Sequence, residues 1–324
     1  MTVAKPLASI SLDLDDLWTY LKTRGDPAWE ARPSYLPVFV PQALDLLERL
    51  ALQITVFVVG ADAVRSENRP YLRAIAERGH RIGNHSFSHE CWLHLMPKAQ
   101  LEAEVIRAEE ALFDATGQRP VGFRGPGFSW SPELLELLSS REYLYDASTL
   151  PSFLGPPARW YFLARSQMTS EERTRRSALY GAFRDGFRPL RPYRWHLPSG
   201  EQILEIPITT FPLIKVPFHM SYLLYLGGMS QSLMFSYLRC AIRACRVMRV
   251  EPSFLLHPLD FLGAEQAPGL SFFPGMTMPG DRKRDLVVRV LGVLSESFQL
   301  VPMEHHAGAI LAAGRLPERV PAFA

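Results

Sequence analysis

The chain has 324 residues, of which 47% are hydrophobic and 21% are charged, and its formal net charge is +2. This composition supports a full hydrophobic core and argues against a disordered chain, and the charge is too small to indicate a nucleic-acid partner. The length suits one large α/β domain or two small ones. Three cysteines are too few and too odd in number for a disulfide framework, which fits a reducing compartment.

The first predicted strand covers residues 8–16, where apolar and polar residues alternate before a cluster of acids, Asp13, Asp15 and Asp16. Carboxylates this close together repel one another unless a cation or a proton lies between them. A solvated acidic turn or a helix N-cap is the alternative interpretation. We expect residues 17–36 to form an aromatic loop, either at the rim of a binding cleft or as a lid on the core.

Strands and helices alternate along the next hundred residues. The predicted elements are a helix from Val40 to Leu50, a strand at 54–59, a helix near 68–78 closed by Gly79, a strand at 81–84, a helix at 97–116 followed by Gly117, a strand at 121–124, a helix opened by Ser131 and a strand at 143–146. This rhythm is typical of a parallel sheet or barrel.

Two histidines, His85 and His89, stand four residues apart just after the predicted strand at 81–84. If the segment between them turns helically, both imidazoles lie on one face and can hold one divalent metal ion. Sites in α/β proteins commonly lie at strand ends of this kind. On its own the pair is a weak signal, because histidines at this spacing are more often ordinary surface or core residues.

Four motifs occur in one order: Asp13-Leu14-Asp15-Asp16, His85-Ser86-Phe87-Ser88-His89, Arg124-Gly125-Pro126-Gly127 and Leu255-Leu256-His257-Pro258. In this order the chain resembles the polysaccharide deacetylase (NodB homology, carbohydrate esterase family 4) superfamily over most of residues 8–260. The resemblance implies a distorted (β/α)7 barrel that removes acyl groups from N-acylated sugars with one divalent ion. The first motif departs from the commonest form, Thr-Phe-Asp-Asp-Gly. It is closer to the Asp-x-Asp branch, which includes unusual peptidoglycan deacetylases and a deformylase of lipid-linked aminoarabinose.

The resemblance also implies roles for individual residues. The metal ligands would be Asp15, His85 and His89, with Zn²⁺ expected and Co²⁺, Ni²⁺ or Mn²⁺ as alternatives. The catalytic residues would be Asp13 as general base, Arg124 as its orienting partner and His257 as general acid. A second register stays open, in which Asp15 is the base and Asp16 the metal ligand.

Expected substrate contacts are Trp18, Pro126, Tyr145 and Asp146. A backbone N–H near Tyr145 or Asp146 would face the developing oxyanion. Either Asp146 or Asp260 would hold the His257 imidazole in its charged form.

Residues 151–200 break the barrel rhythm and are predicted to form an insertion. They contain nine arginines, interleaved with aromatic residues, and only three acids. The insertion is either a solvated basic face or a surface for a phosphate-bearing or membrane-bound substrate. Residues 211–240 are markedly apolar, which indicates either an ordinary packed loop and helix or a mouth for a lipid tail.

The remaining elements are predicted as a strand at 203–208, a helix at 236–248, the final barrel strand at 252–258 and a closing helix at 281–298. His305 and His306 are expected to be exposed. We therefore expect residues 1–324 to form a single NodB-like domain.

The function predicted from these features is removal of an acetyl or formyl group from an amino sugar, favouring a lipid- or polyprenyl-phosphate-linked precursor. The start of the chain is too short and polar for a secretion signal, and no apolar run has membrane-spanning length. We therefore expect a cytoplasmic protein, with peripheral contact to the anionic inner face of the membrane. Two alternatives remain: a catalytically silent glycan- or membrane-binding relative, and a hydrolase of small cyclic amides or ureides.

Overall fold

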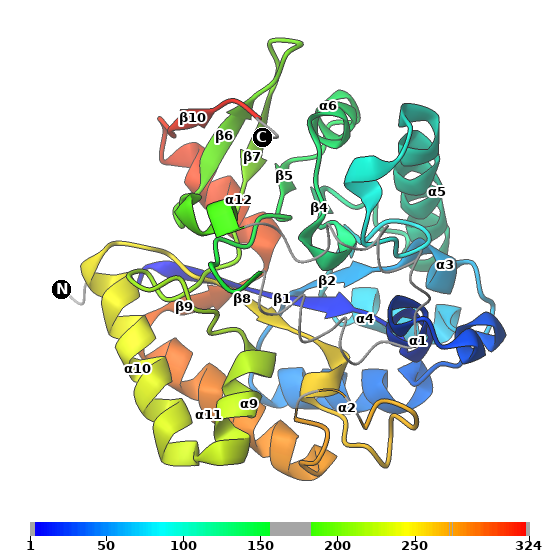
Figure 1. Ribbon diagram of the computed structural model, residues 1–324, viewed down its shortest axis with the longest axis vertical. Helices are drawn as coiled ribbons and strands as arrows, with labels where there is room; N and C mark the ends of the chain where they lie inside the picture. Colours follow the sequence, from blue (N-terminus) through cyan, green and yellow to red (C-terminus); the bar gives the residue numbers. More distant parts are fainter. Residues whose placement is uncertain (1–3, 156–182, 272, 274, 322–324) are drawn as a thin grey trace.

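The computed structural model describes residues 4–155, 183–271, 273 and 275–321. Figure 1 shows β1 crossing the centre of the molecule, with helices packed around the strands. The strands are β1 (Leu7–Leu14), β2 (Thr55–Val58), β3 (Arg81–Asn84), β4 (Gly122–Phe123), β5 (Tyr145–Asp146), β6 (Tyr193–His196), β7 (Gln202–Glu205), β8 (Ser253–Leu256), β9 (Gln299–Val301) and β10 (Glu318–Arg319).

The strands form one sheet in the order β10-β6-β7-β5-β4-β3-β2-β1-β8, with β9 also paired to β1. The pairings are parallel except for the antiparallel pair β6 and β7. Among the described residues no pairing joins the two ends of this order. The predicted α/β barrel-like architecture is therefore confirmed, and its sheet is open rather than closed.

The helices around the sheet are α1 (Leu17–Arg24), α2 (Leu36–Arg49), α3 (Gly60–Ala63), α4 (Arg69–Glu77), α5 (Lys98–Thr116), α6 (Pro132–Ser140), α9 (Met220–Met229), α10 (Gln231–Val247), α11 (Gly280–Ser297) and α12 (Met303–Ala312). Two helix ends lie where the sequence predicted them, because a glycine or a capping side chain determines the position. Gly117 ends α5 at a φ of 73°, and the Ser131 side chain caps α6 by accepting from Leu134 N.

Side chains alternate between the two faces of β1, because successive residues of a strand point in opposite directions. The apolar set packs into the main core: Ile10, Leu12 and Leu14. The polar set lies between them in sequence: Ser9, Ser11 and Asp13. This alternation places Asp13 on the face opposite the main core.

Helix α12 covers the polar face of β1. Met303 N donates to Thr55 Oγ1 at 2.9 Å, and His306 Nδ1 lies 3.1 Å from Ser9 Oγ. The expected exposure of His306 is wrong, because this side chain is fully buried and its Nε2 lies 3.2 Å from Glu251 Oε2. His305, in contrast, is exposed as expected.

The aromatic segment at 17–36 is not a plain loop, since it contains α1 and the 3₁₀ helix η1 (Pro27–Ala31). Asp16 Oδ1 accepts from Leu17 N, which starts α1, and Gly25 ends it at a φ of 83°. Helix α2 also begins earlier than expected, at Leu36, so Pro41 lies inside it.

The predicted insertion lies largely outside the described residues, including Arg159, Arg165, Arg173, Arg175 and Arg176. Its described end contains η5 (Phe183–Phe187) and β6. The apolar region that follows packs as a turn at 211–217 and the pair α9 and α10, which stand beside α11 (Figure 1). In the part of the chain that is described, no helix is both long and apolar enough to cross a bilayer.

Stability in mildly acidic solution should depend on His80, which is 2% exposed and whose Nδ1 accepts from Ile54 N. Burial, with a smaller effect of Arg78, lowers the pKa of His80 from 6.5 to about 4. Between these values the unfolded chain binds more protons than the folded one, so stability falls as pH drops through that window.

At pH 5 the contribution of His80 should amount to about 2 kcal/mol of lost unfolding free energy. Urea unfolding at pH 7 and pH 5 measures this loss. The variant His80→Gln should lose correspondingly less stability between the two pH values. Equal losses in both proteins would contradict the assignment.

Candidate active site

Four expected site residues leave neighbouring parallel strands at the same edge of the sheet: Asp13, His85, Arg124 and His257. The pairing of Leu12 with Leu256 brings the ends of β1 and β8 level. His85 N donates to Val58 O at 3.1 Å and Arg124 N donates to Asn84 O at 3.0 Å, which continues the ladder beyond β3 and β4. The sheet therefore assembles residues from distant parts of the sequence.

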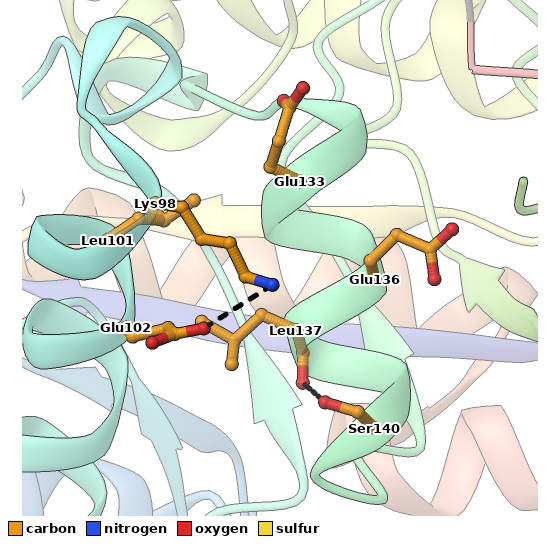
Figure 2. Close-up of a pocket in the computed structure, with 7 residues that line it drawn as sticks. All are labelled: Lys98, Leu101, Glu102, Glu133, Glu136, Leu137 and Ser140. Atoms are coloured by element: carbon orange, nitrogen blue, oxygen red, sulfur yellow. Dashed lines mark hydrogen bonds and ion pairs between the residues drawn. The ribbon is translucent and has the colours of Figure 1, made fainter. Parts of the chain in front are cut away.

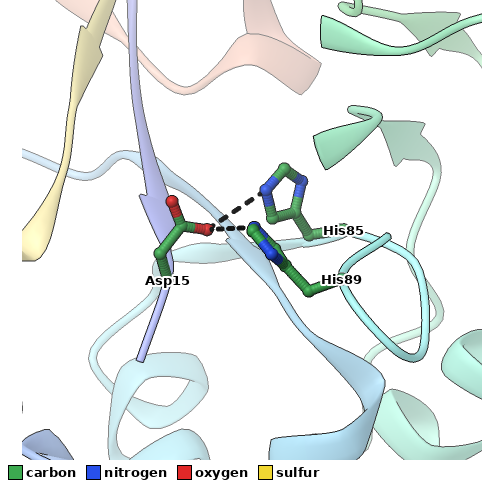
Figure 3. A group of neighbouring side chains, drawn as sticks. All are labelled: Asp15, His85 and His89. Atoms are coloured by element: carbon green, nitrogen blue, oxygen red, sulfur yellow. Dashed lines mark ion pairs between the residues drawn. The ribbon is translucent and has the colours of Figure 1, made fainter. Parts of the chain in front are cut away.

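The side chains of Asp15, His85 and His89 point toward one another from the end of β1 and the loop after β3 (Figure 3). Asp15 Oδ1 lies 3.3 Å from His85 Nε2 and 2.9 Å from His89 Nε2. All three residues are buried, and their ligand atoms lie within 4.8 Å of one another. The first strand's acids and the histidine pair therefore share one site.

The loop between the two histidines is not helical, so the condition attached to the His-x3-His spacing is not met. Ser86 and His89 instead adopt left-handed backbone conformations, with φ values of 59° and 53°. Such conformations are costly for residues with a Cβ and persist where surrounding contacts hold them. The two imidazoles meet Asp15 through this bent loop rather than through helical periodicity.

The three residues fit a divalent cation. His85 Nδ1 lies 2.6 Å from Arg124 O, so this nitrogen carries the proton and leaves Nε2 as a lone-pair donor. Asp15 Oδ1 and His89 Nε2 are buried, and apart from their own 2.9 Å contact and the approach of His85 Nε2 they have no hydrogen-bond partner among the described residues. Ligand atoms around a tetrahedral Zn²⁺ lie roughly 3.3 Å apart. One carboxylate and two imidazoles also leave positions open for water and substrate.

The electrostatics of the metal-free site show how strongly these groups interact. Burial on its own would raise the pKa of Asp15, but His89 and His85 outweigh it and hold the pKa well below its usual value. Burial opposes protonation of His85, yet Asp15 and Asp13 raise its pKa. The site therefore favours positive charge beside Asp15, as a cation site requires.

Asp13 is held by a buried arginine. Arg124 is fully buried, and its Nη1 donates to Asp13 Oδ1 at 2.6 Å and to Ser11 Oγ at 2.9 Å. Its Nε donates to Ala147 O, and its guanidinium lies 4.3 Å from the centre of the Phe57 ring. These contacts fix the Arg124 fork, which in turn orients the Asp13 carboxylate.

Asp16 does not join the group of potential metal ligands. Its Oδ1 accepts from Leu17 N at 2.7 Å and from Tyr35 N at 2.9 Å, so the carboxylate caps α1 and anchors the following segment. Tyr35 in turn donates its hydroxyl to the backbone oxygen of Asp15. This geometry favours the register with Asp15 at the cation site.

His257 is oriented by the segments around it. Its Nδ1 lies 3.1 Å from Ser221 Oγ and 4.0 Å from Asp260 Oδ2, while its backbone N donates to the same Asp260 oxygen at 2.8 Å. Burial raises the pKa of Asp260, and His257 and Ser221 counteract this rise. Of the two carboxylates considered for His257, the structure places Asp260 beside the ring. Asp146 instead accepts from Ser148 Oγ.

The expected substrate contacts are all buried: Trp18, Pro126, Tyr145 and Asp146. Trp18 is 1% exposed and donates Nε1 to Asp62 Oδ1. The Tyr145 ring fills the space where a side chain at Gly122 would lie. These residues are as deeply buried as the candidate ligands, and their contact with substrate stays a prediction.

Three further residues near the site were missed: Tyr20, His219 and Ser221. Burial, with Asp15, Asp260 and Asp13 nearby, raises the pKa of Tyr20 well above its usual value. His219 lies 6.2 Å from His257 between ring centres, and burial lowers its pKa to about 3. Tyr20 lies four residues after Asp16, and this helical spacing could have indicated that it points toward the acids. Nothing in the local sequence indicates that His219 lies beside His257.

A separate hollow of about 330 Å³ lies between α5 and α6 and is shown in Figure 2. Its lining combines acidic, basic and apolar residues: Lys98, Leu101, Glu102, Glu133, Glu136, Leu137 and Ser140. None of the candidate metal or catalytic residues lines it. The chemistry therefore belongs to the strand-end site and not to this hollow.

Residues 8–145 match the family model described as polysaccharide deacetylase. A peptidoglycan deacetylase of Helicobacter pylori is 29% identical over 119 residues, covering 37% of this chain and 40% of the relative. A chitooligosaccharide deacetylase of Sinorhizobium fredii is 34% identical over 101 residues, covering 31% of this chain and 45% of the relative. The matches thus span less than half the length of these relatives.

Solved structures extend the likeness of the fold to nearly the whole chain. A protein of Mycobacterium smegmatis described as a polysaccharide deacetylase aligns with a TM-score of 0.61 at 18% identity, covering 100% of this chain and 96% of that one. An allantoinase aligns with a TM-score of 0.58 at 17% identity, covering 95% and 91%. The family match over residues 8–145, the deacetylase relatives and the four ordered motifs support the polysaccharide deacetylase (NodB, carbohydrate esterase family 4) superfamily for this chain, and the solved structures support its fold.

Proposed function

We propose that this protein is a metal-dependent amide hydrolase that removes an acetyl or formyl group from an amino sugar. The observation that carries the proposal is the convergence of Asp15, His85 and His89 beside an aspartate held by Arg124. The named activities of relatives on peptidoglycan and chitooligosaccharide support the amino-sugar class. The match to an allantoinase supports the fold alone.

Asp15, His85 and His89 would hold the ion, with Zn²⁺ as the first candidate. When bound, a divalent ion supplies Lewis acidity for the amide carbonyl and makes water acidic enough to react near pH 7. The chain's own residues then have to move protons. Asp13 accepts the proton of the attacking water, and the bond from Arg124 keeps its carboxylate in one orientation.

His257 donates the proton that the departing amine needs. Because Nδ1 faces Ser221 and Asp260, Nε2 is the nitrogen available to the substrate. The buried Asp260 carboxylate faces Nδ1 at 4.0 Å and helps to orient the ring. Asp13 and His257 end neighbouring strands, so base and acid would act on one bond from adjacent positions.

We further propose a lipid-linked sugar as the substrate and the cytoplasmic face of an anionic membrane as its location. Between residues 206 and 250 the chain has no acidic residue, and it has five basic ones: Lys215, Arg239, Arg243, Arg246 and Arg249. The turn before α9 exposes Leu213 by 71% and Ile214 by 54%. Basic charge beside exposed apolar side chains suits an anionic lipid surface.

Aromatic contacts connect the 211–217 turn to helix α9, which begins beside His257. Phe211 in this turn lies 5.7 Å from Tyr237 between ring centres, and Tyr237 lies 5.9 Å from Tyr222 on α9. Helix α9 begins beside His257, through Ser221. A membrane at the 211–217 turn would thus lie close to the proposed proton donor and could present a lipid-linked sugar to it.

Metal dependence is tested by stripping the protein with a chelator and measuring hydrolysis of an N-acetylated chitooligosaccharide. Activity should disappear and return on adding Zn²⁺. Asp15→Asn should weaken zinc binding by at least about 100-fold, since even outer-shell changes cost about 10–100-fold. The exposed-carboxylate control Asp45→Asn should bind normally.

The same titration separates the two registers. Asp16→Asn should keep the cap of α1, because asparagine caps helices about as well as aspartate, and should still bind zinc. Loss of zinc in Asp16→Asn but not in Asp15→Asn would contradict the proposed ligand set. Full activity of metal-free protein would contradict metal dependence altogether.

The role of Asp13 is tested by Asp13→Asn. Loss of a general base should lower kcat by about 10²–10⁴-fold while zinc affinity stays within a few-fold of the parent protein. Ser11→Ala is the matched control, because it removes the other acceptor of Arg124 Nη1 and leaves the carboxylate in place. A kcat for Asp13→Asn within tenfold of that for Ser11→Ala would rule out Asp13 as the base.

Membrane contact is tested by co-sedimentation with phosphatidylglycerol vesicles. Binding should be stronger than to phosphatidylcholine vesicles and should fall at high salt. Ile214→Asp should weaken it by about tenfold or more, because an apolar contact is replaced by a like-charged one. Phe113→Asp on α5 is equally exposed, at 54%, and should bind as the parent does. Equal binding of both variants would exclude the 211–217 turn as the contact.

A further inference from the structure

The two histidines at the site are held by different means. The His85 ring is fixed by its own contact with Arg124 O, at 2.6 Å. The His89 ring pairs with Asp15 Oδ1 through Nε2 at 2.9 Å, and its Nδ1 has no hydrogen-bond partner among the described residues. His89 also sits in the left-handed region, with a φ of 53°. Apart from the pairing with Asp15, the direction of the ring is therefore set by the backbone on either side of it.

Contacts from two other helices hold that backbone. On the α5 side, Glu104 Oε2 accepts from Phe87 N at 3.0 Å and from Ser88 N at 2.8 Å. On the α1 side, Lys22 Nζ donates to Ser88 O at 2.8 Å and forms an ion pair with Glu90. Lys22 thus binds the residue before His89 and the residue after it.

Lys22 is itself held in place. Its side chain is 13% exposed, and Nζ lies 5.7 Å from the Trp18 ring centre and 5.3 Å from that of Trp29. Trp18 is fixed in turn by its bond to Asp62. Partial burial strengthens the ion pair relative to one in bulk water, and the aromatic faces favour the ammonium group.

The position of Lys22 in the chain gives these contacts a purpose beyond packing. Helix α1 starts at Leu17, two residues after Asp15, and is capped by Asp16. Helix α1 follows Asp15 and carries Lys22 in its last turn, and Lys22 binds the loop that contains His89. A cross-brace of this kind sets the distance between Asp15 and His89.

We propose that Lys22 is a positioning residue for the metal site and holds His89 in register with Asp15. The inference rests on the proposed function, because it assigns Lys22 a role toward the same ion. The same role accounts for the positions of the Trp18 and Trp29 rings beside the Lys22 ammonium group, since neither ring takes part in the proposed catalytic steps. Lys22 touches neither substrate nor ion and acts only through the His89 loop.

The test compares zinc affinity, measured by competition with a chelating indicator, in the full chain and its variants. Lys22→Met keeps the length of the side chain and removes the ammonium group. It should weaken zinc binding by about 10–100-fold, as changes in residues that orient metal ligands do. Lys22→Arg can still donate to Ser88 O and Glu90, and should restore the affinity to within about threefold.

The matched control is Lys98→Met, which removes a lysine that is 81% exposed and pairs loosely with Glu102 at 3.8 Å. It should bind zinc as the parent chain does. The melting temperature of the metal-free protein is the second readout, and for Lys22→Met it should stay within about 3 °C of the parent.

Three results would contradict the proposed role of Lys22. Zinc affinity of Lys22→Met within twofold of the parent overturns the inference while leaving the proposed function intact. A fall in the metal-free melting temperature of more than about 8 °C, with no rescue by Lys22→Arg, makes Lys22 a purely structural residue and also overturns it. Failure of the parent chain to bind zinc overturns the proposed function and this inference together.

Discussion

Two imidazoles and one carboxylate meet in a buried space, with Asp15 Oδ1 as their common point. Groups of this kind are strongly hydrated in water, and they are costly to bury unless something satisfies them. Here Asp15 Oδ1 and the His89 nitrogens have no hydrogen-bond partner among the described residues beyond the contacts within this group. A shared cation would offset this cost, and the surrounding structure keeps the three groups together.

The site residues are positioned first by strand pairing and then by individual side-chain contacts. Parallel pairing of β8, β1, β2, β3 and β4 brings the strand ends to one edge and sets positions to within a few ångströms. The fine positions come from individual contacts. Tyr35 holds the backbone of Asp15, Arg124 holds Asp13 and the His85 ring, and Asp260 lies beside His257. Only these individual contacts distinguish a hydrolytic site from a generic strand edge.

Local periodicity predicted the strand at 81–84, a strand at 252–258 that is observed as β8 at 253–256, and the glycine-ended helix α5, because these features depend on nearby residues. Motif order predicted the group Asp15, His85 and His89, which the structure brings together through a loop that is bent rather than helical. Helix α1 was missed because its aromatic residues were read as a rim and the Gly25 stop was overlooked, although a helix N-cap had been an alternative interpretation of the acids and Asp16 is that cap. The burial of Trp18 and the approach of His219 to His257 depend on packing between distant segments, so no local pattern could predict them.

Crystallographic anomalous diffraction from zinc-loaded protein tests the central claim most directly. We expect one strong peak with Asp15 Oδ1, His85 Nε2 and His89 Nε2 each about 2.0–2.2 Å away. A stoichiometrically bound ion located elsewhere, or one held by Asp16 in place of Asp15, would contradict the account.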